Sequence, residues 1–217
     1  MTYPLTIIDN FFEDPDQIVE NARKLKTYNS PGNWPGTRTK MLHVANHRLF
    51  EYFCNRIYKI FSDDIPEYYN MQTQFQFISP LADEQWDKRN RGWIHQDLDT
   101  WFGGIVYLNK NPEPNTGTTI YRPKYGFTRQ TNKELNHKEA LYRNEELDLD
   151  EYNKAWDIMY DQYIETVKIE NVYNRFVLFP AYAHHGVETY GHKQERITLN
   201  FFGREMTGHI PPNLRSV

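Results

Sequence analysis

Four side chains of the kinds that bind metals and anions stand in the second half of this sequence. His95 and Asp97 are separated by one residue, so an extended backbone would point the imidazole and the carboxylate to the same side. His185 lies in a later segment, and Arg196 follows it by eleven residues. Two histidines and a carboxylate form the facial triad of non-haem Fe(II) sites, and a guanidinium binds a carboxylate through two parallel N–H groups. This set predicts a metal centre with an anion-binding arginine beside it.

Alternation along the strand distinguishes His185 from its neighbour His184. His185 shares a face with Ala183 and Val187, which are apolar, whereas His184 shares a face with Glu188. We therefore expect His185 to point inward and His184 to point outward. A hydrogen-bonded core histidine remains the alternative for His185.

The segment that contains Arg196 alternates in the same way. One face carries Arg196, Thr198 and Asn200, and the other carries Ile197, Leu199 and Phe201. Its distance from His185 predicts that Arg196 lies on the next strand of a hairpin. The alternative is a surface ion pair with Glu195 or Glu188, which would contribute little.

The elements that must position these side chains are mostly short strands. In residues 71–77, glutamines alternate with apolar residues, which predicts a half-buried strand. The other expected strands are 92–97, 104–109, 118–122, 166–172, 175–180, 183–189 and 196–202. About eight short strands separated by turn residues are typical of an antiparallel sandwich or jelly roll.

Helices are expected at the N-terminus and late in the chain. Asp14 and Pro15 are an N-cap and first-turn pair, and a second helix with a wide apolar stripe is expected over 48–62. Cys54 lies in that stripe and is expected to be a buried packing residue. A third helix is expected over 150–165, with an aromatic stripe that serves packing. The polar stretch 123–150 is read as a solvated loop, with a lid over a site as the alternative.

Composition limits the classes of function. The 217 residues include 25 basic and 29 acidic ones, a net charge of −4, which argues against a nucleic-acid partner. The longest apolar runs are too short for a membrane span, and the N-terminus lacks a secretory signal. A single cysteine excludes an internal disulfide framework. We expect a cytoplasmic protein with one domain over 1–217: helical support over 1–65 and a jelly-roll core over 71–202 with an insertion over 123–165.

In order and spacing, these motifs resemble the Fe(II)/2-oxoglutarate-dependent oxygenases, in the prolyl 4-hydroxylase-like branch. The matching segments are 95–97, 107–109, 117–123, 179–180, 185–187 and 196–198. The opening 8–15 resembles that of small bacterial and phage members. One departure is that Gly117 is followed by Thr118, where the family often has a glycine pair.

The resemblance implies a mostly β, α+β fold: a double-stranded β-helix (jelly-roll, cupin-like) core flanked by N-terminal helices. It implies that His95, Asp97 and His185 are the catalytic Fe(II) ligands and that Arg196 binds the distal carboxylate of 2-oxoglutarate. Tyr107 matches a position that donates a hydroxyl to that carboxylate, with a core tyrosine as the alternative. Thr198 matches a small hydroxyl position beside it.

The activity implied is hydroxylation of a protein side chain such as proline, or of a small molecule. It consumes 2-oxoglutarate and O2 and releases succinate and CO2. The primary substrate and the oligomeric state are left open. Two alternatives use the same fold: a cupin-type metal-binding jelly roll that does not use 2-oxoglutarate, and a non-enzymatic binding protein.

Overall fold

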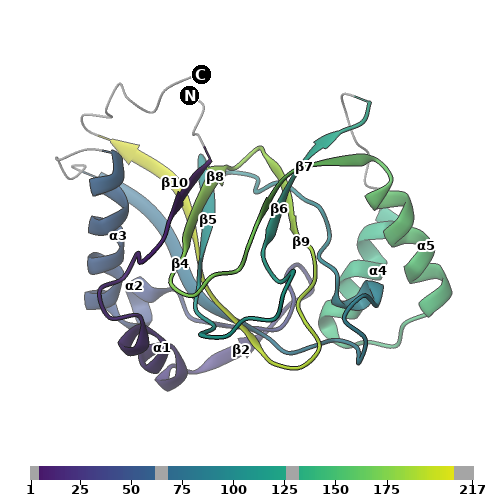
Figure 1. Ribbon diagram of the computed structural model, residues 1–217, viewed down its shortest axis with the longest axis horizontal. Helices are drawn as coiled ribbons and strands as arrows, with labels where there is room; N and C mark the ends of the chain where they lie inside the picture. The colour runs from purple at the N-terminus through teal and green to yellow at the C-terminus, as the bar shows by residue number, and fades with distance from the viewer. Residues whose placement is uncertain (1–4, 62–67, 126–131, 208–217) are drawn as a thin grey trace.

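Two antiparallel sheets and five helices make up the described part of the chain (Figure 1). The structure, a computed structural model, describes residues 5–61, 68–125 and 132–207. The strands are β1 (Thr6–Ile8), β2 (Thr27–Asn29), β3 (Thr37–Thr39), β4 (Tyr68–Ile78), β5 (Phe102–Tyr107), β6 (Thr118–Pro123), β7 (Tyr163–Ile169), β8 (Phe176–Pro180), β9 (His184–Val187) and β10 (Arg196–Thr207). The helices are α1 (Pro15–Lys24), α2 (Leu42–Ala45), α3 (His47–Phe61), α4 (Asn132–Arg143) and α5 (Leu149–Tyr160), with a short 3₁₀ turn, Lys88–Asn90.

The larger sheet has the strand order β1-β8-β5-β10-β4-β3-β2, and the smaller sheet has the order β7-β6-β9. The two sheets lie opposite each other in the middle of the molecule (Figure 1). This is the predicted jelly-roll arrangement of short antiparallel strands. In the described part of the chain, no helix is long and apolar enough to cross a membrane.

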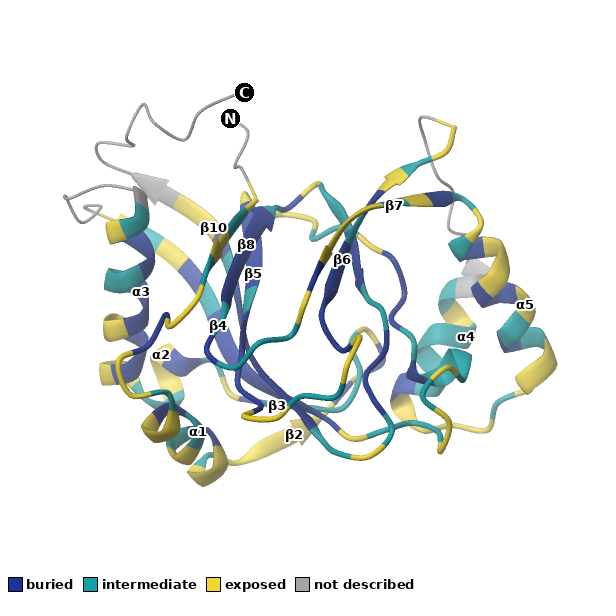
Figure 2. Ribbon diagram, viewed as in Figure 1, coloured by how far each residue is buried: buried dark blue, intermediate teal, exposed yellow. Residues whose placement is uncertain are grey.

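Helices α1 and α3 cover the outer face of the larger sheet. The sequence predicted that N-terminal helices flank the core in this way. The Asp14 side chain caps α1 by accepting a hydrogen bond from the Gln17 backbone N–H, and Pro15 opens the first turn. Figure 2 shows the buried side of α3 turned toward the strands. Cys54 is fully buried there, which confirms its packing role. The helix expected over 48–62 also included Phe61 and Ser62. The side chain of Phe61 and the whole of Ser62 lie outside the described residues.

Strand β10 divides its side chains between two environments. Ile197, Leu199 and Phe201 belong to the core shared with α1 and α3. Phe201 stacks on Phe176 at 5.0 Å between ring centroids and meets Phe53 of α3 edge-on. The opposite, polar face therefore points toward the smaller sheet.

A second aromatic core joins α4 and α5 to the smaller sheet. It contains Trp93, Tyr121, Tyr142, Tyr152, Trp156, Met159 and Tyr163. Trp93 Nε1 donates a hydrogen bond to the Tyr152 hydroxyl at 3.1 Å. This contact ties the segment that precedes His95 to α5, so the aromatic stripe serves packing, as predicted.

Three expectations about the elements were wrong. The stretch 123–150 was read as a loop, yet it contains α4; residues 126–131 lie outside the described residues. The helix expected over 150–165 ends at Tyr160, because the chain turns there and Tyr163 begins β7. Strand β4 is not half-buried: Gln74 and Gln76 are 8 % and 4 % exposed, because the smaller sheet and its loops cover the face that the glutamines occupy.

The N-terminal region contributes strands as well as helices. Strand β1 pairs with β8, and the hairpin of β2 and β3 extends the larger sheet beyond β4. These strands have three residues each, too few for alternation to reveal them. Through β3, the N-terminal region reaches the polar face of the larger sheet.

Candidate metal centre

Three side chains with metal-binding atoms converge between the two sheets: His95, Asp97 and His185. Their ligand atoms all lie within 4.8 Å of one another. The Nε2 atom of His185 is 3.5 Å from Asp97 Oδ2, and the Nε2 atom of His95 is 3.9 Å from Asp97 Oδ1. Both imidazoles therefore turn the same nitrogen toward the carboxylate.

Backbone carbonyls fix the tautomer of both rings. His95 Nδ1 lies 2.8 Å from the Trp93 carbonyl oxygen, and His185 Nδ1 lies 2.9 Å from the Ala183 carbonyl oxygen. A carbonyl oxygen only accepts, so each Nδ1 carries the proton and each neutral ring keeps the Nε2 lone pair free. This is the orientation that a backbone partner imposes on metal-binding histidines.

Electrostatics favour the neutral form of His95. Desolvation, followed by the charges of His185 and Lys138, holds the pKa of His95 well below its usual value of 6.5, although the Trp93 carbonyl opposes this shift. Its side chain is 44 % exposed, but the exposed edge faces a cavity that the protein surrounds. The ring is therefore available as a ligand at neutral pH.

Asp97 presents an oxygen atom without a partner. Its Oδ2 is buried and accepts no hydrogen bond from the described residues. A buried carboxylate oxygen normally has a partner, so the missing partner must be supplied from outside the protein. Gly103 of β5 makes room for it: a Cβ at that position would lie 2.6 Å from Oδ2. The donor set, the tautomers and the unpartnered oxygen all fit a divalent transition metal.

Backbone hydrogen bonds position all three residues. His95 and His185 form an antiparallel bridge in which each N–H donates to the other residue's carbonyl, at 3.0 and 2.9 Å. The Asp97 N–H donates to the Ala181 carbonyl at 3.0 Å. The expectation that 92–97 forms a regular strand was wrong: the segment runs along β9 with one bridge and a hydrogen bond from the Gly92 N–H to the Val187 carbonyl, without a continuous ladder.

His184 and His185 differ as strand alternation predicts. His185 is 7 % exposed and lines the cavity. His184 is half-buried outside it, with its ring 5.0 Å from that of Tyr163. The Phe179 ring packs on the His185 ring at 4.3 Å between centroids and limits its movement.

Arg196 borders the same cavity and is 3 % exposed. Its Nε donates to the Thr116 carbonyl at 2.9 Å, while its Nη2 is buried and has no partner among the described residues. Burial lowers the pKa of this guanidinium, and Tyr107 and Tyr190 partly offset that effect. A buried guanidinium with a free donor is suited to bind an anion.

Two interpretations of Arg196 were wrong. It does not form a surface ion pair with Glu195 or Glu188: Glu195 pairs with Arg23 and Glu188 with Lys168. It does not continue a hairpin from His185 either, because β9 pairs with β6 in the smaller sheet and β10 pairs with β4 and β5 in the larger one. The chain crosses between the sheets, which places the two residues on opposite walls of one cavity.

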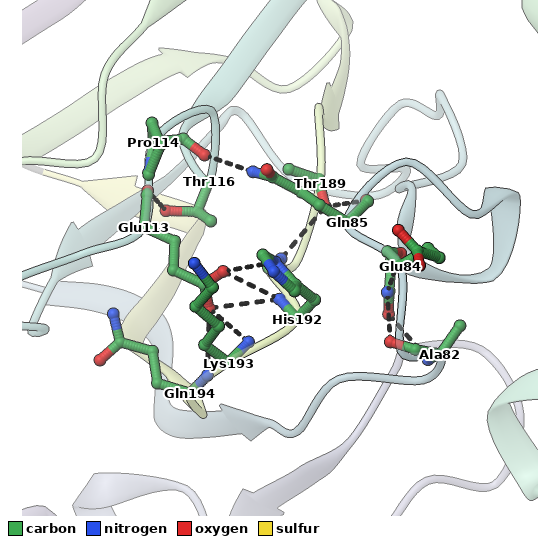
Figure 3. Close-up of polar contacts among 12 residues, drawn as sticks. Ala82, Glu84, Gln85, Glu113, Pro114, Thr116, Thr189, His192, Lys193 and Gln194 are labelled. Carbon is green, nitrogen blue, oxygen red and sulfur yellow. Dashed lines mark hydrogen bonds and ion pairs between the residues drawn. The ribbon is translucent and has the colours of Figure 1, made fainter.

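The loop that makes this crossing is held by Glu113 (Figure 3). Its carboxylate accepts hydrogen bonds from the backbone N–H groups of His192, Lys193 and Gln194 at 2.9–3.2 Å. Burial would raise the pKa of Glu113, but these backbone donors outweigh it and lower the pKa below its usual 4.5. A charged clamp therefore fixes the chain just before Arg196.

The loop between β5 and β6, which contains Glu113, also holds the partner of Arg196. The Thr116 hydroxyl donates to the Glu113 carbonyl at 2.7 Å, which orients the Thr116 carbonyl that accepts from the guanidinium. Gln85 donates to the Pro114 carbonyl and accepts from the Thr189 hydroxyl, so three loops are joined (Figure 3).

Tyr107 and Thr198 flank Arg196 but do not line the cavity. They face each other across β5 and β10, and both are fully buried. The Tyr107 hydroxyl donates to Thr118 Oγ1 at 2.7 Å, and the Thr198 hydroxyl donates to Asn200 Oδ1 at 2.8 Å. Burial raises the pKa of Tyr107, so its hydroxyl stays protonated.

The cavity has a volume of about 240 Å³ and is lined by residues of both sheets, of β3 and of α4. Sequence reasoning missed several lining residues: Arg38, Gln76, Lys138, Tyr142 and Asn200. The sequence could have indicated Gln76 and Asn200 as lining residues, since both lie on the polar face of strands whose other face is strongly apolar. No sequence pattern indicated Arg38 and Lys138, because they lie in elements outside the predicted core.

The fold and the three-ligand cluster define the class of protein: a jelly-roll protein with the fold of the 2-oxoglutarate oxygenases. Solved structures show the same fold. HygX from Streptomyces hygroscopicus with nickel and 2-oxoglutarate bound matches with a TM-score of 0.59 at 14 % identity, over 93 % of this chain and 82 % of that one. A Pseudomonas putida prolyl-4-hydroxylase matches with a TM-score of 0.56 at 12 % identity, over 94 % of each chain. A Trichoplax adhaerens prolyl hydroxylase in complex with a hypoxia inducible factor peptide fragment matches with a TM-score of 0.53 at 13 % identity, over 92 % and 82 %.

Residues 1–202 match the model of the family described as "Family of unknown function (DUF6445)", so this chain belongs to that family. A search of curated protein sequences found no match. The solved structures are too distant in sequence to carry their activities over, and they establish the fold alone.

Proposed function

We propose that this protein is an Fe(II)- and 2-oxoglutarate-dependent dioxygenase that hydroxylates its substrate and releases succinate and CO2. The observation that carries the proposal is convergence on one cavity: the triad of His95, Asp97 and His185 on one side and the buried, partly unpartnered Arg196 on the other. The fold shared with the P. putida prolyl-4-hydroxylase and with HygX supports membership of the 2-oxoglutarate oxygenase superfamily, and the prolyl 4-hydroxylase-like branch rests on the sequence resemblance alone. The free, buried Cys54 is consistent with the reducing cytoplasm.

Each member of the triad has a distinct task at the metal. His95 and His185 would provide Nε2 lone pairs, and Asp97 would provide negative charge through the oxygen that lacks a partner. Three protein ligands leave the remaining positions of an octahedral ion open. Bound Fe(II) would supply the redox chemistry by which O2 oxidises 2-oxoglutarate and the substrate.

Arg196 would orient the cosubstrate. Its free Nη2 donor would bind the distal carboxylate of 2-oxoglutarate, and its Nε bond to Thr116 would hold the guanidinium in place. Tyr107 and Thr198 would support that guanidinium from the flank, with the Tyr107 ring centroid 5.5 Å from Arg196 Cζ. Residues of α4, β3 and the two sheets would form the walls around the reacting groups.

Binding and turnover can be tested separately. Calorimetry measures 2-oxoglutarate binding to protein loaded with Mn(II), and a second assay measures succinate release with Fe(II). A hydrogen bond to a charged group contributes about 1.5–3 kcal/mol, so Arg196→Gln should weaken 2-oxoglutarate binding by roughly 10–150-fold. The Mn(II) affinity of this variant should not change.

A matched pair of aspartates tests the metal site. Asp97→Asn should abolish tight Mn(II) binding and succinate release, whereas Asp99→Asn should leave both unchanged. Asp99 is exposed and has φ = 60°, a conformation that asparagine tolerates. Equal succinate release by wild type and Asp97→Asn would refute the proposal. Metal binding without 2-oxoglutarate binding would favour a cupin-type metal-binding protein.

A further inference from the structure

The cavity holds more positive charge than the proposed metal and cosubstrate require. Three cationic side chains line it, Arg38, Lys138 and Arg196, against the carboxylate of Asp97, which leaves an excess of two positive charges. In the described part of the chain, no other carboxylate lines the cavity. A divalent metal and doubly negative 2-oxoglutarate would cancel each other, so this excess would persist when both are bound.

Arg38 is held in place yet has an unused donor. It lies on β3, opposite Gln76 of β4, and its Nη2 donates to Gln76 Oε1 at 3.3 Å. The guanidinium packs over the Trp34 ring with Cζ 4.6 Å from the centroid. Its Nε is buried and has no hydrogen-bond partner among the described residues.

Arg38 and Lys138 both lie on the metal side of the cavity. Burial lowers the pKa of Arg38 to about 10, and the charge of Asp97 partly offsets this, which places the guanidinium within electrostatic reach of the triad. The ammonium group of Lys138 acts on His95 from α4 and lowers the pKa of that ring. In the described residues, neither cation forms an ion pair within 4.0 Å. Burial lowers the pKa of Lys138, and the charge of Glu139 partly offsets this. With a pKa of about 10, Arg38 is charged but unneutralised at pH 7.

Arg38 is also separated from the proposed cosubstrate anchor. In the register of the larger sheet, Arg38 pairs with Gln76, which pairs with Thr198, whereas Arg196 pairs with Ile78. Gln76 also accepts a hydrogen bond from Asn200, so a row of polar side chains that starts at Arg38 runs across β3, β4 and β10 on the cavity side of the larger sheet. Two separate cationic positions on one cavity indicate two separate anionic groups.

We infer that Arg38 and Lys138 form a second anion site beside the metal, which binds a carboxylate or phosphate group of the primary substrate. This inference rests on the proposed function, because it assigns Arg196 to 2-oxoglutarate. Unneutralised cations in a cavity raise the local concentration of anionic ligands, and the planar fork of Arg38 favours an oxyanion. The substrate is therefore an acidic small molecule or an acidic group small enough to enter the cavity.

The test uses simple anions on the loaded protein. Wild-type protein is saturated with Ni(II) and N-oxalylglycine, a non-reactive analogue of 2-oxoglutarate, and is titrated calorimetrically with inorganic phosphate and, in a second arm, with acetate. We expect saturable binding of at least one anion at millimolar or lower concentration. The arm that binds more tightly identifies the group as phosphate or carboxylate.

Three variants assign the binding. Arg38→Gln and Lys138→Gln should each weaken anion binding by at least about tenfold, since each loses a charged hydrogen-bond partner. Both should keep the wild-type affinity for Ni(II) and N-oxalylglycine within twofold. Lys40→Gln removes a positive charge from an exposed position just beyond β3 and should leave anion binding unchanged. Because Lys138 lies on α4 and Arg38 on β3, a folding defect in one variant does not affect the other.

Three results would overturn the inference: no binding of either anion to the loaded wild type, anion binding as tight as wild type in both Arg38→Gln and Lys138→Gln, or loss of N-oxalylglycine affinity in Arg38→Gln. The last result would assign Arg38 to the cosubstrate. Failure of N-oxalylglycine to bind the metal-loaded wild type would instead refute the proposed function. In that case the same titration with Ni(II) alone still reports whether Arg38 and Lys138 bind an anion.

Discussion

A single methyl group at Gly103 should disable the metal centre without unfolding the protein. In Gly103→Ala, the new Cβ would lie 2.6 Å from Asp97 Oδ2, whereas ordinary contacts begin at 3.4 Å. The next neighbour, Phe202 Cδ1, is 3.5 Å away, so the conflict is confined to the carboxylate. Alanine is tolerated in a strand at least as well as glycine, and β5 itself should be undisturbed.

The size of the effect follows from these distances. The carboxylate must retreat by about 0.8 Å, the difference between the two contacts, which exceeds the roughly 0.2 Å tolerance of a metal–ligand bond. Disturbing the support of a ligand typically costs 10–100-fold in metal affinity. We therefore expect the Kd for Mn(II) to rise by about 10–100-fold, equivalent to about 1.4–2.8 kcal/mol.

Calorimetry with Mn(II), together with the unfolding temperature of the metal-free protein, measures both parts of this prediction. Gly186→Ala is the matched control: it also lies beside the triad, but its Cβ would meet its nearest neighbours at 3.5–3.6 Å. In an Asp97→Ala background, Gly103→Ala should have no further effect on metal binding, because the clashing carboxylate is gone. A Kd for Mn(II) within twofold of wild type in Gly103→Ala would refute the assignment of Asp97 Oδ2 as a ligand atom.

Two further predictions concern the support of the fold. Glu113→Gln should lower the free energy of unfolding at pH 7 by about 2 kcal/mol, because charge-assisted hydrogen bonds to the crossing loop are lost. Since the native pKa of Glu113 is lowered, its contribution to the free energy of unfolding is present above pH 4.5 and disappears as the pH falls through the native pKa. Urea unfolding should therefore show the stabilities of variant and wild type converging in acid. A difference in stability that stays constant with pH would contradict this. Burial raises the pKa of Cys54 to about 12, so a thiol reagent should label it only in the unfolded protein, and rapid labelling of the native protein would show that α3 opens.

Alternation along strands is the part of the sequence that predicted the site best. It separates His185 from His184 and Arg196 from Ile197, because a strand has a period of two and one face must meet the apolar core. The N-cap at Asp14 was equally readable, since capping is a local interaction. These features depend only on near neighbours in the chain.

Alternation does not reveal what covers the polar face of a strand. Gln74 and Gln76 read as solvent-facing residues, but both are buried, and Gln76 lines the cavity together with residues of the smaller sheet. The crossing from β9 to β10 was misread as a hairpin for the same reason: a turn sequence does not state which sheet the next strand will join. Such information resides in contacts between distant segments.

The same distinction separates the shared part of the site from the part that is particular to this chain. The triad and Arg196 lie in or beside the jelly-roll strands, where the backbone geometry of the fold dictates their placement. Arg38 and Lys138 are brought to the cavity by β3 and α4, which lie outside that core. Because β3 and α4 supply the excess positive charge, substitutions in these two elements can change that charge without disturbing the proposed metal ligands. Under the proposed function, substrate selection should therefore depend on these elements more than on the residues that carry the resemblance.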